Sequence, residues 1–157
     1  MTPFLHASAR AFLLVHAVVG FAAVGAATHL ATYSVGIARG REPWRGRARL
    51  FGLLVPALFL AAFVVGLMLY PAWRIDVRAA VLDARSPATS AAFELKEHLA
   101  ALTLPFLGGA AALALWPRTR ETRWMAATLA VAAATLIWTV ALVGLYVAAV
   151  RAVGGLS

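Results

Sequence analysis

Long apolar runs separated by short polar stretches dominate the pattern along this chain. The runs are rich in Ala and Leu, which favour helices, and they lack the alternation of apolar and polar positions that predicts a strand. About 20 apolar residues in a helix cross the hydrocarbon core of a bilayer, and four runs are long enough to do so. The pattern predicts four membrane-spanning helices, at about residues 11–38, 50–70, 91–116 and 124–150.

The composition agrees with a membrane environment. Of the 157 residues, 63% are hydrophobic and only 13% are charged, which is less charge than the surface of a soluble domain of this size needs. The absence of cysteine excludes disulfides and thiolate metal sites. The net charge of +8 comes from short basic clusters between apolar runs, and these are too short for the basic stripe of a nucleic-acid-binding protein. The expected partner is the lipid bilayer, with no nucleic acid.

The basic clusters also predict the orientation of the helices. Five Arg residues lie at positions 39–49 and three at positions 118–123, each group against a single acid, whereas positive and negative charges balance over residues 71–98. Because cytoplasmic loops carry the excess of Lys and Arg, the first and third loops are expected inside. Short connections favour antiparallel neighbours. The predicted fold class is all-α: one domain, residues 1–157, forming an integral membrane four-helix bundle, up-down-up-down, with both termini outside (N-out, C-out).

The first apolar run has an alternative interpretation as a secretory signal peptide, because Arg10 precedes a run that leads into small residues. The run continues, however, to the basic cluster at 39–49, a pattern that is typical of a stop-transfer segment. A retained first helix is therefore the favoured prediction. The Arg- and Ala-rich composition indicates a bacterial origin, so the expected location is the inner (cytoplasmic) membrane.

The extracytoplasmic loop, residues 71–90, carries turn residues at Tyr70–Pro71 and at Ser86–Pro87. Between them the spacing predicts an amphipathic helix with Ile75, Ala79 and Leu82 on one face. One interpretation is a helix that lies on the membrane surface, held by salt bridges of Arg74, Asp76 and Arg78. The alternative is a docking surface for other membrane or extrinsic subunits.

Two histidines occupy matching positions in the first and third helices. His16 lies 23 residues before Arg39, and His98 lies 20 residues before Arg118. Both helices are predicted to run from outside to inside and to face each other across the bundle, so we expect the two imidazoles at similar depth in its outer half. Such a pair suits bis-histidine ligation of a haem or part of a metal site. Gly20, one turn from His16, would make room for a flat macrocycle or equally allow close helix packing.

Two acidic residues stand beside His98. Glu94 shares a helix face with His98, while Glu97 is displaced from it by about 100°. Three interpretations stay open. The acids stabilise the N-terminus of the third helix, or Glu94 supports His98 or joins His16 and His98 in a metal site, or Glu94 and Glu97 begin a proton relay towards His29. His29 follows His16 by 13 residues, so the two point to different faces of the first helix; an interhelical hydrogen bond is its other interpretation.

A helical bundle with histidines at matched depth resembles membrane-embedded b-type cytochromes and the haem-bearing anchor subunits of quinone-linked dehydrogenases. The resemblance covers the architecture and two positions, His16 and His98, and includes no diagnostic motif. It implies at most one bis-histidine haem b, because the second and fourth helices contain no histidine.

Known catalytic motifs are missing from the sequence: it has no Gly-rich phosphate loop, no nucleophile elbow and no H-E-x-x-H. An independent enzyme is therefore not expected. The favoured hypothesis is a redox-associated integral membrane subunit, with a haem b between His16 and His98. Two alternatives stay open: a structural or assembly subunit without a cofactor, and a small proton or metal-ion permease.

Overall fold

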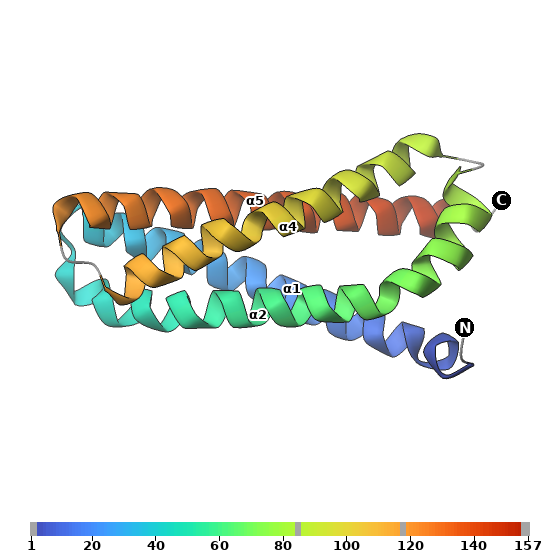
Figure 1. Ribbon diagram of the computed structural model, residues 1–157, viewed down its shortest axis with the longest axis horizontal. Helices are drawn as coiled ribbons and strands as arrows, with labels where there is room; N and C mark the ends of the chain where they lie inside the picture. Colours follow the sequence, from blue (N-terminus) through green and yellow to red (C-terminus); the bar gives the residue numbers. More distant parts are fainter. Residues whose placement is uncertain (1–2, 84–85, 117–118, 155–157) are drawn as a thin grey trace.

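Helices make up the fold in the part of the chain that the computed structural model describes, residues 3–83, 86–116 and 119–154. Side chains are described from residue 8 to residue 150, except those of residues 76, 80–82, 84, 85, 117 and 118. Four long helices account for most of the described chain (Figure 1): α1 (Pro3–Ala38), α2 (Arg45–Ala72), α4 (Pro87–Leu115) and α5 (Arg120–Gly154). A 3₁₀ turn, η1 (Glu42–Trp44), precedes α2, and a π-helical segment, η2 (Trp73–Leu82), follows it.

Four helical segments are long and apolar enough to cross a membrane: Ser8–Ala38 in α1, Glu42–Ala79 over η1, α2 and part of η2, Pro87–Leu115 in α4 and Arg120–Val150 in α5. The predicted all-α class with four apolar helices is therefore confirmed for the described residues. The helices are longer than predicted, because polar residues extend the apolar runs without breaking them. The third predicted helix, for example, begins at Pro87 and not at residue 91. Proline suits the first turn of a helix, where its missing N–H has no partner to lose.

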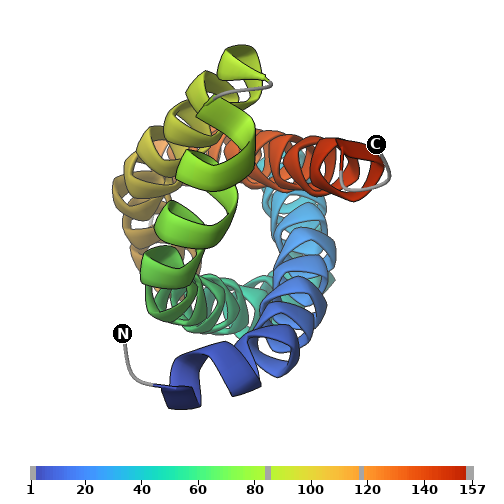
Figure 2. The same cartoon turned by 90° about the vertical axis from the view of Figure 1, so that its right-hand side faces the viewer.

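The four helices form a ring in which α1 and α4 each pack against both α2 and α5. Viewed end-on, the helices surround a common axis (Figure 2). The α1–α2 and α4–α5 connections lie at one end of the molecule (Figure 1), which we call the basic end because Arg39–Arg49 and Arg120 lie there. The first turns of α1, the last turns of α5 and η2 lie at the opposite end, the terminal end.

Small side chains fill most of the core. Ala26, Ala27, Ala130 and Ala133 are buried in one cluster with a few larger residues, among which Leu30 is 1% exposed. Alanine and glycine allow helix backbones to approach closely in a membrane, where packing replaces the hydrophobic effect as the force between helices. At Gly52 of α2, a Cβ atom would lie 3.0 Å from the Cβ of Ala114 on α4. The α2–α4 crossing therefore depends on glycine at position 52.

The basic end is held together by one acidic residue. Glu42 of η1 forms an ion pair with Arg45, whose Nε lies 2.5 Å from Oε2, and accepts a hydrogen bond from Arg123 of α5 at 2.5 Å, so it joins the start of α2 to the start of α5. Gly40, with a φ of 93°, ends α1. The N–H groups of Gly40 and Arg41 donate to the carbonyls of Ile37 and Gly36, the Schellman pattern that a left-handed glycine permits.

The prediction for residues 71–90 is wrong in one respect. The expected turn at Tyr70–Pro71 is absent, since α2 continues through both residues to Ala72. The segment that follows, η2, is π-helical, so each N–H reaches back five residues. Ile75 and Ala79, two residues of the expected apolar face, are both exposed, and the side chain of Leu82 lies outside the described residues. Val77, which that face did not include, is buried against Trp73, Phe93 and Val147.

Candidate functional site

His16 is held against α2 by its ring. Its Nδ1 lies 2.8 Å from the main-chain oxygen of Ala62, and the imidazole is half-buried. Gly66 makes this position available, because a Cβ at residue 66 would lie 3.2 Å from Cε1 of His16 and 3.5 Å from its Nδ1. A carbonyl oxygen only accepts hydrogen bonds, so Nδ1 donates and carries a proton. In the neutral ring, Nε2 is then the nitrogen that is left to bind a proton or a metal ion.

His98 has the same kind of hydrogen bond in different surroundings. Its Nδ1 lies 2.7 Å from the main-chain oxygen of Glu94, one turn earlier in α4, so Nε2 is again the nitrogen with the free lone pair. The ring is exposed, whereas that of His16 is half-buried. The group of Glu94 that hydrogen-bonds His98 is therefore its main-chain oxygen, and not its carboxylate as predicted. The Glu94 carboxylate accepts from Arg78 of η2 at 2.5 Å.

Lys96, which the sequence analysis did not single out as a site residue, is the ionisable side chain of α4 that the structure places near His16. Its positive charge acts on His16 and on Glu97. Its ammonium nitrogen lies 5.0 Å from the centre of the Phe93 ring, and its Cε lies 3.5 Å from where a Cβ of Gly144 on α5 would stand. Residues two positions apart in an α-helix differ by about 200° around its axis. Because α4 turns Lys96 towards α5, it turns His98 away.

Other charged side chains lie near Lys96 at the terminal end. Arg78 of η2 bonds Glu94 and also lies 3.5 Å from Asp83, which accepts from the hydroxyl of Ser90 at 2.7 Å. Glu97 interacts electrostatically with Lys96, His98 and Arg78. Of the three residues predicted to form salt bridges in the loop, Arg78 does so. Arg74 is exposed, and the Asp76 side chain lies outside the described residues. We call Arg78, Glu94, Lys96 and Glu97 the terminal charge cluster.

The other residues predicted for the site lie elsewhere. His29 is exposed and packs on aromatic rings, with centroids 5.8 Å away at Tyr33 and 5.1 Å away at Phe51 of α2. These contacts do not bring it to Glu94 or Glu97, the other members of the predicted relay. A Cβ at Gly20 would meet nothing within 4 Å. The glycine that makes room beside His16 is therefore Gly66 of the neighbouring helix.

The two predicted ligands fit a haem in one respect and not in another. Metal-bound histidines usually donate their second nitrogen to a carbonyl or carboxylate, as Nδ1 does in both His16 and His98. A haem enclosed by a single chain would need both rings to face a shared space, and the exposed position of His98 does not fit this. The structure describes no contact between the rings. Within the described ranges, three or more His, Asp or Glu side chains nowhere gather to hold a metal ion.

Comparisons with protein-family models, with curated proteins and with solved structures find no match to this chain. The resemblance to b-type cytochromes therefore stays a prediction that rests on His16, His98 and the four apolar helices.

Proposed function

We propose that the protein is a redox-associated integral subunit of a larger complex in a bacterial inner membrane. Support comes from four helices that are long and apolar enough to span a bilayer. Further support comes from a sequence without the motifs of an independent enzyme. The candidate functional residues, His16 and the terminal charge cluster, lie at the terminal end.

In the proposed topology the helices run up-down-up-down, with the basic end in the cytoplasm and the terminal end outside. The positive-inside rule supports this orientation, because both Arg-rich connections lie at the same end of the molecule (Figure 1).

A reporter protein fused after Ser157 is accordingly expected to be active only outside the cytoplasm. The same reporter inserted after Arg41, in the connection between α1 and α2, serves as the control and is expected inside. A cytoplasmic signal from the C-terminal fusion would contradict the proposed orientation.

The redox role rests on one observation: His16 and His98 both donate Nδ1 to a main-chain carbonyl and keep Nε2 available. A haem b bound through such nitrogens would supply one-electron transfer. His98 is exposed, so another subunit is needed to enclose its Nε2. For this reason we propose a subunit and not an isolated protein. Its contact with partners would include η2, where Arg74 and Ile75 are exposed and Arg78 pairs with Glu94.

The test is a reduced-minus-oxidised absorption spectrum of the complex that co-purifies with the tagged chain. A b-type spectrum is expected, and both His16→Ala and His98→Ala should remove most of it, because loss of an axial ligand removes a metal bond. His29→Ala is the matched control and should leave the spectrum intact. A complex without any haem spectrum would contradict the redox proposal and favour a structural or assembly subunit.

A second candidate, a small proton permease, is favoured by Lys96. A charged side chain within a membrane-spanning helix is costly and is by default a functional hypothesis. The ion pairs of the described residues do not include Lys96, and its charge acts electrostatically on His16. A metal-ion permease has less support, because the described residues hold no cluster of three or more ligands.

A further inference from the structure

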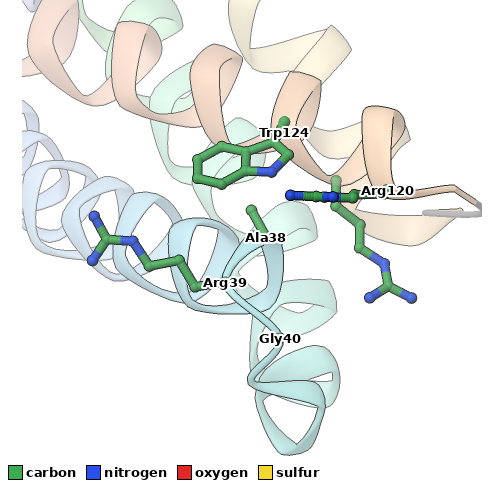
Figure 3. Close-up of a pocket in the computed structure, with 6 residues that line it drawn as sticks. Ala38, Arg39, Gly40, Arg120 and Trp124 are labelled. Carbon is green, nitrogen blue, oxygen red and sulfur yellow. The ribbon is translucent and has the colours of Figure 1, made fainter.

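A cavity opens at the basic end, between the end of α1 and the start of α5. Its volume is about 570 Å³, within the range of small-molecule sites. Figure 3 shows Ala38 in the middle, with the indole of Trp124 facing it and the side chains of Arg39 and Arg120 extending to either side. The lining residues are Ala38, Arg39, Gly40, Arg120, Arg123 and Trp124.

The charge of this cavity is entirely positive. Three of its six lining residues are Arg and none is acidic. Arg123 pairs with Glu42 through one terminal nitrogen, but its Nε is buried and has no hydrogen-bond partner among the described residues. Arg39 and Arg120 take part in none of the ion pairs described. The cavity therefore offers several guanidinium donors, and no acidic side chain is among its lining residues.

The position of the cavity points to a membrane ligand. Ala38 ends one membrane-spanning segment and Arg120 begins another, so the cavity lies where the hydrocarbon core meets the aqueous layer. Trp124 is 43% exposed, and an exposed indole at that depth is typical of the membrane interface. Met125, next to it on α5, is 56% exposed and apolar, so it offers a surface to an acyl chain.

We infer that this cavity binds a phosphate-bearing ligand, the headgroup of an anionic phospholipid in the leaflet at the basic end. The Arg residues that line the cavity supply the guanidinium groups, whose bidentate bonds match the phosphate oxygens. The positive end of the α5 macrodipole adds to the attraction. Basic pockets between membrane helices on the cytoplasmic side are suited to such headgroups. This site is independent of His16 and His98.

The test measures lipid binding to the detergent-purified full chain by native mass spectrometry. Phosphatidylglycerol is expected to bind in preference to phosphatidylcholine. The double variant R39Q/R120Q should bind phosphatidylglycerol about 30-fold more weakly, since each Arg near a lipid surface contributes roughly five- to sixfold. The control is R47Q/R49Q, which removes the same charge at the same end from residues that do not line the cavity, and it should bind as the wild type does.

Two results would overturn the inference. Equal weakening in both double variants would show that only the overall charge matters. Glycerol 1-phosphate that binds as tightly as phosphatidylglycerol would identify a soluble phosphate, and not a lipid, as the ligand. If R39Q/R120Q does not purify as a folded protein, by circular dichroism and gel filtration, R120Q alone carries the same test against R49Q.

Discussion

Leucine in place of Gly52 is expected to lower the free energy of unfolding by about 3 kcal/mol, the upper part of the usual range for an overfilled core. A Cβ at this position already lies 3.0 Å from the Cβ of Ala114 and 3.9 Å from the main chain of Ala111. The remaining carbons of leucine fit only if α4 moves away from α2, because a helix backbone cannot rotate aside as a side chain does. Reversible unfolding in mixed micelles measures the change.

Gly108→Leu is the matched control for this substitution. It makes the same chemical change in α4, but a Cβ at residue 108 would meet nothing within 4 Å. We expect a change of less than about 1 kcal/mol, in the stabilising direction, because leucine favours a helix more than glycine does. Equal losses of stability in the two variants would contradict the close α2–α4 crossing.

Replacing Glu42 by Gln is expected to destabilise the bundle by about 2 kcal/mol, a typical value for hydrogen bonds that involve charged groups. The substitution removes both ion pairs of the carboxylate, those with Arg45 and with Arg123. These two Arg residues are partly buried, and the Nε atom of Arg123 has no hydrogen-bond partner among the described residues. Their charges would then be left with no neighbouring anion, and the starts of α2 and α5 would separate.

Glu121→Gln removes one negative charge from the same end and serves as the control. Glu121 is exposed, and its described contact is a hydrogen bond from the Thr119 hydroxyl at 3.3 Å. We expect a change within about 0.5 kcal/mol, as for most surface substitutions. The comparison uses the same unfolding measurement. Similar effects of the two variants would mean that the ion pairs of Glu42 contribute nothing beyond general charge.

The four helices were predictable because their signal is simple. An apolar run of about 20 residues in a chain with few charges has hardly any stable arrangement other than a membrane-spanning helix. The connection after α2 was not predictable in the same way. Pro71 normally marks a boundary, but in this chain it lies inside α2 and is followed by the π-helical η2. Sequence spacing that assumes an α-helix does not indicate which side chains such a segment buries, and the burial of Val77 was not predicted.

The rotation of α4 about its axis limited the prediction of the site. Apolar residues occupy all faces of a membrane helix, so the sequence does not indicate which face is turned to its neighbours. His98 was expected to face α1, but the structure places Lys96 near His16 and leaves His98 exposed. One signal was present in the sequence. Lys96 is the single lysine of the chain, and it lies within the third candidate spanning segment. A charged side chain there is costly, so it indicates a functional role.

The ion pair between Glu42 and Arg123 has a consequence for how the protein is made. The two residues are 81 positions apart, so Glu42 leaves the ribosome long before Arg123 does. Until then Arg45 is the one of its two partners that is available to the carboxylate. Arg123 reaches Glu42 only when the start of α5 packs beside η1. The contact is therefore made late, and it marks a chain whose first and second helix pairs have come together.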